Sequence, residues 1–163
     1  MQEFTEIANR LADEAGEIVR RHFRQPFDVE TKSDDSPVTI ADRGVEKRMR
    51  EIIEEERPQD GILGEEFGEK PSESGLTWVL DPIDGTKSFV IGRPTFGTLI
   101  ALCEDGIPKL GVIDQAILKE RWVGLLIFSG HLVERLVAVN HERHGTALRV
   151  LPDISPSLFQ LCF

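Results

Sequence analysis

The sequence is short of cysteines, of basic residues and of long apolar runs, and each shortage excludes a class of protein. Its two cysteines, Cys103 and Cys162, lie far apart and have no metal-ligand spacing. This excludes a disulfide-stapled secreted scaffold and suits a reducing cytosol. No apolar run reaches the length of a membrane span, and the charges from Glu3 onward are not those of a signal peptide. We therefore expect a cytoplasmic protein with no membrane partner.

Basic residues are outnumbered, with 19 Lys and Arg against 29 Asp and Glu and a net charge of −10. A general basic surface for nucleic acid is excluded, although such a chain can still bind phosphate locally by recruiting a cation. The three acids and three bases after residue 124 balance, so the whole net charge lies in residues 1–124. With 163 residues and 40% apolar content, the chain is long enough to bury a core of its own.

Two segments carry apolar residues at steps of three and four, which predicts two amphipathic helices. The first extends from about residue 3 to 24 and the second from about Ile40 to Glu56, and a proline follows each. Thr39 is a plausible N-cap of the second helix. Asp42, three residues on, is either the carboxylate of a short capping box or a residue of a functional site.

Shorter apolar runs predict strands at residues 61–64, 77–80, 96–102, 110–113 and 121–123. A turn at Glu104–Gly106 joins the third of these to the fourth. Helices followed by hairpin-linked strands indicate an α+β fold. We expect a layered sandwich in which the two N-terminal helices pack on a largely antiparallel sheet.

The string from Trp78 to Thr86 is the most informative one in the sequence. An apolar strand delivers Asp81 to its carboxyl end, where Pro82 is expected to stop the strand. Asp84 follows three residues after Asp81, and two ionised carboxylates this close repel each other. A divalent cation removes the conflict, and oxygen ligands favour Mg²⁺ or Mn²⁺ over zinc. The plainer alternative is that Asp-Pro and Asp-Gly only make a turn.

The end of this string also predicts a seat for phosphate. Asp84 is expected to cap a helix that starts here, Gly85 lets a ligand approach the backbone, and the N–H groups of the first turn attract anions. Metal ligands beside an anion cradle are what hydrolysis of a phosphate ester requires. The acidic cluster Gly64–Gly68 follows another short strand and would add a carboxylate, although alone such a cluster is more often a solvated turn.

Three motifs, in their order and spacing, resemble the inositol-monophosphatase-like, magnesium-dependent, lithium-sensitive phosphatases. They are Pro37–Asp42, Gly64–Glu66 and Trp78–Phe89. The resemblance covers Thr5 to about Gly124, three quarters of the chain. Within the family, the histidinol-phosphate phosphatase branch is resembled most closely by Phe89–Leu102, Leu110–Gln115 and Glu120–Trp122.

The resemblance implies two or three Mg²⁺ ions, with Mn²⁺ as a substitute. Glu65 would bind the first metal and help position the attacking water. Asp81 would bridge two metals, the backbone carbonyl of Ile83 would add a ligand, and Asp84 would bind the second metal. The implied reaction is in-line attack of water on a phosphomonoester without a covalent intermediate.

The resemblance also places the substrate phosphate beside Asp84, on the N–H groups of Gly85 and Thr86. The Thr86 hydroxyl, paired with Asp42, would help activate the water, and loop 31–37 would be mobile over a weaker third metal. Alternatives stay open for both side chains, because Asp42 can serve only as a helix cap and Thr86 only as a first-turn residue.

Residues 125–163 depart from the family pattern. Family members continue into a second domain with a Trp-Asp motif that supplies a further metal ligand, whereas neither Trp78 nor Trp122 is followed by Asp. We therefore expect a metal-binding phosphatase domain at 1–124, an atypical tail at 125–163, and a missing second domain. A truncated or frame-shifted reading or a natural fragment would explain this, and activity would be impaired.

The expected function is Mg²⁺-dependent hydrolysis of a small phosphomonoester, with histidinol phosphate of histidine biosynthesis as the leading substrate. Inositol monophosphate or another small sugar phosphate is the alternative within the class. An inactive fragment that keeps the family's dimer surface, and so acts only as an interaction module, is the alternative from another class. A homodimer is implied by the resemblance, and no nucleic-acid partner is expected.

Overall fold

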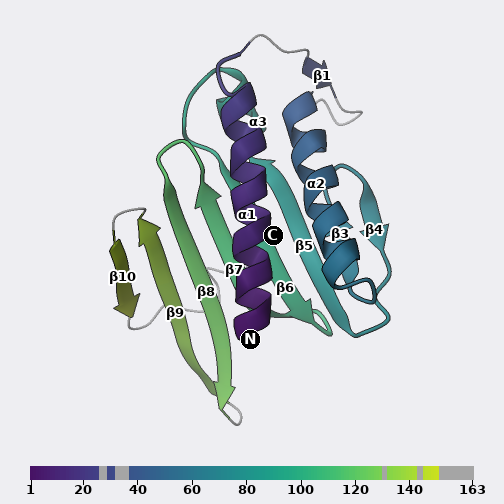
Figure 1. The fold of residues 1–163 in the computed structure, drawn as a ribbon, viewed down its shortest axis with the longest axis vertical. Coiled ribbons are helices and arrows are strands. Elements are labelled where there is room, and N and C mark those ends of the chain that lie inside the picture. The colour runs from purple at the N-terminus through teal and green to yellow at the C-terminus, as the bar shows by residue number, and fades with distance from the viewer. Residues whose placement is uncertain (26–28, 32–36, 130–131, 143–144, 151–163) are drawn as a thin grey trace.

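The structure is a computed structural model that describes residues 1–25, 29–31, 37–129, 132–142 and 145–150. Residues 29–31 and 37–39 and the strand residues beyond Leu125 are described by their backbone alone. Two long helices lie side by side on one face of a broad sheet (Figure 1). They are α1 (Gln2–His22) and α2 (Ile40–Glu56), and a short third helix is α3 (Thr86–Val90).

The main sheet has eight strands in the order β10-β9-β8-β7-β6-β5-β3-β4. Their bounds are β3 Gly61–Gly64, β4 Gly68–Lys70, β5 Leu76–Asp84, β6 Gly97–Glu104, β7 Ile107–Gln115, β8 Glu120–Ser129, β9 Leu132–Glu142 and β10 Gly145–Val150. All neighbours are antiparallel except β3 and β5, which run parallel. The predicted layered α+β fold is confirmed, with a mixed sheet.

A separate two-stranded sheet pairs β1 (Val29–Thr31) with β2 (Pro37–Thr39). It leads the chain from α1 into α2. The predicted boundary after residue 124 falls inside β8, whose backbone continues without a break to Ser129. The division of the chain into two parts at that point stays a prediction. Within the described residues, no helix is both long and apolar enough to cross a membrane.

The expectation that Pro82 ends its strand is wrong, since β5 continues to Asp84. The pairing of β5 with β6 is regular up to Asp81 and then shifts register before Asp84. Pro82 lies in this irregular step, where its missing N–H costs no ladder hydrogen bond. Its carbonyl accepts a hydrogen bond of 2.8 Å from the hydroxyl of Thr98. The bulge turns the end of β5 without terminating it.

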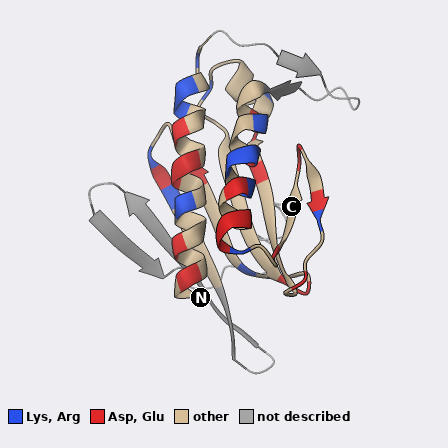
Figure 2. Ribbon diagram, turned by 45° about the vertical axis from the view of Figure 1, so that its right-hand side comes forward, with Lys and Arg blue, Asp and Glu red and all other residues tan. Residues whose placement is uncertain are grey.

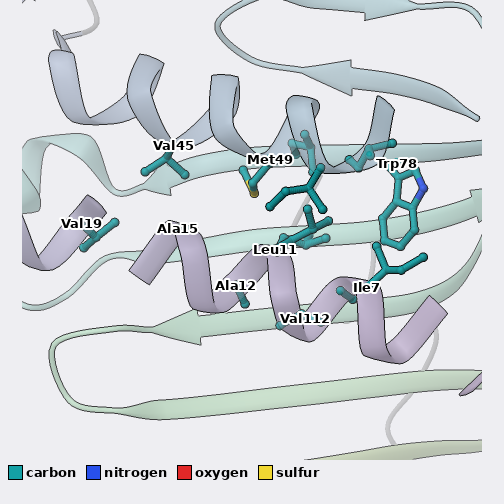
Figure 3. Close-up of a cluster of buried hydrophobic side chains, with 14 of the residues drawn as sticks. Ile7, Leu11, Ala12, Ala15, Val19, Val45, Met49, Trp78 and Val112 are labelled. Atoms are coloured by element: carbon teal, nitrogen blue, oxygen red, sulfur yellow. The ribbon is translucent and has the colours of Figure 1, made fainter. Parts of the chain in front are cut away.

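The core lies between the two long helices and the sheet (Figure 3). Both helices bury one stripe of apolar residues, and charged residues occupy their outer faces (Figure 2). The sheet contributes alternate residues from its central strands, because successive side chains of a strand point to opposite faces. The fully buried members include Leu11, Val19, Val45, Met49, Ile52, Ile62, Trp78, Ile100 and Leu110.

Three phenylalanines hold α3 in place behind the end of β5. Phe89 of α3 packs edge-on against Phe96, with ring centroids 5.1 Å apart, and both contact Phe23 at the end of α1. Aromatic contacts of this kind combine large apolar area with a preferred geometry. The segment between β5 and β6, which contains Gly85 and Thr86, is therefore tied to the core.

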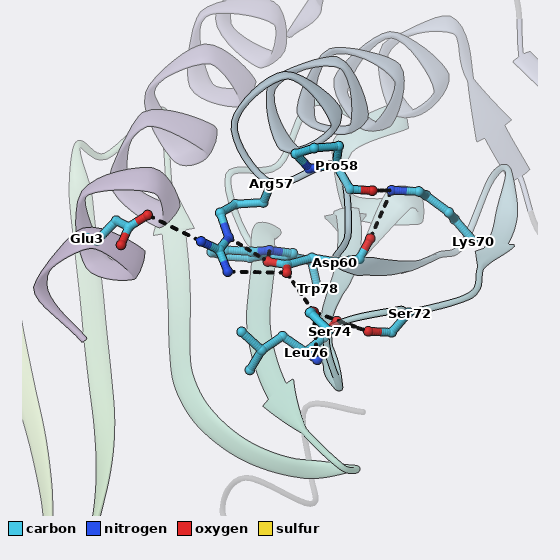
Figure 4. A network of polar contacts seen from close by, with 9 residues as sticks. All are labelled: Glu3, Arg57, Pro58, Asp60, Lys70, Ser72, Ser74, Leu76 and Trp78. Atoms are coloured by element: carbon cyan, nitrogen blue, oxygen red, sulfur yellow. Dashed lines mark hydrogen bonds and ion pairs between the residues drawn. The ribbon is translucent and has the colours of Figure 1, made fainter.

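A polar network joins the end of α2 to the starts of β3 and β5 (Figure 4). The fully buried carboxylate of Asp60 accepts hydrogen bonds from the indole N–H of Trp78 at 3.1 Å and from the hydroxyl of Ser74 at 2.7 Å. The guanidinium of Arg57 donates to the same carboxylate at 3.1 Å. A buried charge is tolerated only when it is paired and hydrogen-bonded in this way.

Replacing Leu11 tests how tightly α1 is packed. Leu11→Ala leaves a cavity at a side chain with 0% exposure, and we expect it to lower the free energy of unfolding by about 2–5 kcal/mol. Leu118→Ala is the matched control, since Leu118 is 54% exposed, and should cost less than about 0.5 kcal/mol. Urea unfolding followed by circular dichroism measures both, and equal losses would contradict the described core.

Candidate metal centre

The parallel pairing of β3 with β5 brings two of the predicted ligands to one edge of the sheet. In this register Gly64 lies opposite Leu80, so the residues that follow, Glu65 and Asp81, emerge side by side. Carboxyl ends of adjacent parallel strands are a common place for ligand sites. The Gly64–Glu66 motif and Asp81 are far apart in the sequence, and the pairing of β3 with β5 makes them neighbours in space.

Asp81 is the most perturbed group of the candidate site. Burial raises the pKa of its carboxyl from 3.8 to about 7, helped by the negative charges of Glu65, Asp84 and Asp42 and by a hydrogen bond with Glu65. Four acidic side chains from three segments therefore act on one another here. The charges of Glu65, Asp84 and Asp42, all predicted site residues, thus reach Asp81, and their role as metal or catalytic residues stays a prediction.

The oxygen Oδ1 of Asp81 is buried and, among the described residues, has no hydrogen-bond partner. A buried acceptor of this kind is costly unless something binds it. A divalent cation supplies that partner and cancels the repulsion between the carboxylates, so the residues fit Mg²⁺. As they stand, no three Asp, Glu, His or Cys side chains of the described part already form a shell around one point.

The segment after Asp81 differs from the prediction at the start of α3. The N-cap of α3 is Gly85 and not Asp84, and no side chain caps this helix. Asp84 is still paired with Gly97 as part of β5, so its backbone is not free to begin a helix. The carboxylate of Asp84 is exposed beside Asp81, which suits a ligand better than a cap.

Gly85 is required by its backbone conformation and by its neighbours. Its φ of 88° is a left-handed value that side chains disfavour. An added Cβ would lie 3.1 Å from the carbonyl oxygen of Thr95 and 3.3 Å from Phe96. Because α3 has only five residues, the predicted phosphate seat depends on the N–H groups at its start more than on a helix dipole. That seat stays a prediction.

Thr86 directs its hydroxyl to the carbonyl oxygen of Ile83, at 3.0 Å. Two predicted site residues are thus in contact with each other, and this bond holds the Ile83 carbonyl at the end of β5. The predicted pairing of the Thr86 hydroxyl with Asp42, and the role of the Ile83 carbonyl as a ligand, stay predictions. For the hydroxyl to donate to Asp42 it must turn away from Ile83.

Asp42 lies in the first turn of α2, and its side chain is 2% exposed. Its charge raises the pKa of Asp81, which favours a site role over that of a solvated cap. The side chain of Thr39, the expected N-cap, lies outside the described side chains. Of the expected mobile loop 31–37, residues 32–36 lie outside the described residues, and its two ends belong to β1 and β2.

The sequence analysis did not single out Glu46 and Arg50 of α2. Glu46 has 0% exposure and accepts hydrogen bonds from the backbone N–H groups of Glu66 and Phe67. A signal for it exists, because Glu46 lies one helical turn after Asp42 on the stripe that also buries Val45 and Met49. A charged residue within an apolar stripe indicates a buried partner.

Arg121 and Asp114 form a second cluster that sequence reasoning missed, away from the predicted site. Arg121 donates to Asp114 at 2.7 Å and to Asp13 of α1 at 2.9 Å. They help line a cavity of about 400 Å³ whose walls contain none of the predicted metal ligands. The ion pairs fasten α1 to β7 and β8.

Comparison with known proteins identifies the class to which this fold and site belong. The inositol monophosphatase family matches residues 1–142, so the chain belongs to this family of phosphatases. The match extends past Gly124, where the resemblance of the motifs ends. Metal dependence, generally on Mg²⁺, is typical of the family.

Two named relatives point to a narrower group. The bifunctional phosphatase IMPL2 of Arabidopsis thaliana is 53% identical over 127 residues, which are 77% of this chain and 37% of the relative. The histidinol-phosphatase of Mycobacterium tuberculosis is 48% identical over 117 residues, covering 71% of this chain and 45% of the relative. The chain thus spans about half the length of the curated relatives it matches, or less.

Solved structures agree with the fold. An inositol monophosphatase from Zymomonas mobilis is 55% identical, with a TM-score of 0.65 over 76% of this chain and 47% of that one. An inositol monophosphatase of Thermotoga maritima is 28% identical, with a TM-score of 0.69 over 83% of this chain and 54% of that one. The two helices and the mixed sheet are therefore those of the family.

Replacing Asp81 tests the crowding of carboxylates without any metal. The folded protein holds the Asp81 proton up to about pH 7 and the unfolded chain only up to 3.8, so this group lowers the stability as the pH rises through that window. Asp81→Asn removes the effect. In metal-free buffer, we expect its gain in free energy of unfolding to be about 1–3 kcal/mol larger at pH 8 than at pH 4.5.

The control for this experiment is Asp105→Asn, because Asp105 is exposed in the turn between β6 and β7, is not among the groups that raise the pKa of Asp81, and should change the stability little at either pH. Thermal unfolding followed by circular dichroism, with a chelator present, measures all three proteins. A loss of stability in Asp81→Asn at pH 8 would contradict the crowding and would assign Asp81 an ordinary structural role.

Proposed function

We propose that this chain is the metal-binding half of a Mg²⁺-dependent phosphomonoesterase of the histidinol-phosphate type. The observation that carries the proposal is the buried Oδ1 of Asp81, which has no hydrogen-bond partner among the described residues, on a carboxyl whose pKa is raised to about 7 by burial and by the neighbouring carboxylates. An arrangement that costs stability and leaves this buried oxygen without a hydrogen bond fits a site that is completed by a cation.

Each predicted site residue has a task in this proposal. Asp81 and Glu65 would hold the first metal, and Asp81, Asp84 and the carbonyl of Ile83 would hold the second. Bound Mg²⁺ supplies a Lewis acid that polarises a phosphate oxygen and lowers the pKa of a coordinated water. A weaker third ion near Asp42 and replacement by Mn²⁺ belong to the same proposal.

The substrate phosphate would lie on the N–H groups at the start of α3, beside Asp84. Gly85 permits a close approach because it has no side chain, and Thr86 adds the next N–H. The Thr86 hydroxyl, turned from Ile83 toward Asp42, would orient the attacking water and take part in moving its proton. These residues bind and align, and in-line attack on the phosphorus then needs no covalent intermediate.

Histidinol phosphate is the substrate we favour, because relatives named histidinol-phosphatase are 48% and 46% identical to this chain. Inositol monophosphate is the second candidate. It is favoured by the 55% identity to the Zymomonas mobilis inositol monophosphatase and by a tomato relative named inositol monophosphatase 1 at 32% identity. A homodimer in solution is part of the proposal.

The alternative from another class is an inactive interaction module. It is favoured by two observations: the chain covers about half of each relative or less, and neither Trp78 nor Trp122 is followed by the Asp of the expected Trp-Asp motif. Such a chain would keep part of the metal site and lose turnover. Binding of Mg²⁺ and release of phosphate must therefore be measured separately.

The experiment measures phosphate release from histidinol phosphate, inositol 1-phosphate and a generic aryl phosphate, with and without Mg²⁺. We expect Mg²⁺-dependent release that falls at least about 100-fold in Asp81→Asn, since a ligand matters at least as much as the groups that orient it. Asp105→Asn, in the distant turn between β6 and β7, is the control and should match the wild type.

The possible outcomes distinguish the two candidate substrates and the inactive module. A higher kcat/KM for histidinol phosphate supports the favoured substrate, and a higher value for inositol 1-phosphate overturns it. Equal phosphate release from the wild type and from Asp81→Asn would contradict the proposal that this chain is a phosphatase. A wild type that binds Mg²⁺ by calorimetry but releases no phosphate would establish the half-site without turnover.

A further inference from the structure

We propose that Glu46 of α2 is a positioning residue that fixes the turn carrying Glu65 and so sets the cation affinity of the metal centre. The inference rests on the proposed function, because it assigns Glu65 to the metal. It concerns a buried carboxylate that would not itself touch the metal or the substrate. The contacts of Glu46 with the turn after β3 carry it.

Glu46 holds the turn through its backbone. One carboxylate oxygen of Glu46 accepts the N–H of Glu66 at 2.7 Å, and the other accepts the N–H of Phe67 at 3.1 Å. Charge-assisted hydrogen bonds of this kind are about twice as strong as neutral ones. With both following amides held, the peptide that leads out of Glu65 has a fixed orientation.

Arg50, one turn further along α2, completes the clamp. Its Nε donates to Glu46 at 2.8 Å, and another guanidinium nitrogen donates to the carbonyl of Gly68. Arg50 therefore joins the buried carboxylate to the far end of the same turn. Its flat donor group reaches both acceptors at once, which a lysine ammonium cannot reproduce.

The carboxylate of Glu46 packs closely against Gly64 at the end of β3. A Cβ added at Gly64 would lie 1.9 Å from the Oε1 atom of Glu46, so only glycine leaves room for the clamp. Gly64 is also the last residue of β3 and pairs with Leu80, directly before Asp81. The clamp thus acts one residue before Glu65 as well as one and two residues after it.

The spacing along α2 links the clamp to the metal centre. Asp42, Glu46 and Arg50 follow one another at intervals of four residues, which places them on one face of the helix. Asp42 contributes to the raised pKa of Asp81, and Glu46 and Arg50 hold the neighbouring turn. One helix face therefore sets the position of both Asp42 and Glu65 relative to Asp81.

The test compares two buried carboxylates at opposite ends of β3. Glu46→Gln weakens the clamp, because an amide offers one acceptor oxygen where the carboxylate offers two. Asp60→Asn is the matched control, since Asp60 also has 0% exposure and an arginine partner but lies before β3, away from Glu65. Both should lower stability, so stability alone does not separate a positioning role from a structural one.

The readout that separates them is the dissociation constant for Mn²⁺ or Mg²⁺, measured by calorimetry on protein shown to be folded by circular dichroism. We expect Glu46→Gln to weaken binding about tenfold or more and Asp60→Asn to stay within about twofold of the wild type. Equal weakening in both variants, or none in Glu46→Gln, would overturn the inference.

Arg50→Lys is the second variant, for the case in which Glu46→Gln does not fold. It keeps the charge, lies at a side chain with 14% exposure, and loses the simultaneous contact with Glu46 and Gly68. We expect a loss of cation affinity of about two- to fivefold with a smaller loss of stability than in Glu46→Gln, since a lysine keeps a positive charge beside Glu46, and an unchanged affinity would count against the clamp. A wild type that binds neither cation would instead overturn the metal centre itself, and the inference with it.

Discussion

The repulsion between carboxylates at the edge where β3 and β5 end is the constraint on which the rest of this structure depends. Asp81 is held in partly buried surroundings by the strand that carries it, and Glu65, Asp84 and Asp42 surround it. Burial and like charge both disfavour the ionised form, so its pKa rises to about 7. The fold tolerates this local cost because the core elsewhere is well packed, which is common at functional sites.

The surrounding elements keep these charges from moving apart. The parallel pairing of β3 with β5 sets Glu65 beside Asp81, and the bulge at Pro82 turns Asp84 back toward the same place. The phenylalanine cluster ties α3 to the core, and Glu46 with Arg50 fastens the turn after β3. Preorganised charges of this kind bind a cation without first paying for their own ordering.

The sequence predicted the two long helices and the five strands β3, β5, β6, β7 and β8, because their signals are local, and it did not predict β1, β2, β4, β9 and β10. Apolar spacing located α1 and α2 to within two residues at each end, and short apolar runs located parts of those five strands. It misjudged Pro82 and the cap of α3, since both depend on the pairing of β5 with β6. A register shift arises between strands, and no residue of β5 alone encodes it.

The candidate site was predictable for a different reason. Asp81 and Asp84 carry their signal in one short string, and Glu65 followed from a resemblance to a known family. Glu46 was missed because it is a charged residue on a helix that looks amphipathic, and Asp60 because it lies in the short connection between α2 and β3. Their partners are backbone N–H groups and side chains of other elements, and the neighbouring sequence does not name these partners, although the place of Glu46 on the apolar stripe of α2 indicates that it is buried.

The central claim is that this crowded edge of the sheet is a site for divalent cations. Crystals soaked in Mn²⁺, with data collected near the manganese absorption edge, locate the ion directly by its anomalous scattering. The account predicts a peak within ligand distance, about 2.0–2.6 Å, of Asp81 Oδ1, with Glu65 or Asp84 as a second ligand. No peak there at saturating Mn²⁺, with Asp81 Oδ1 bonded to a protein donor, would contradict it.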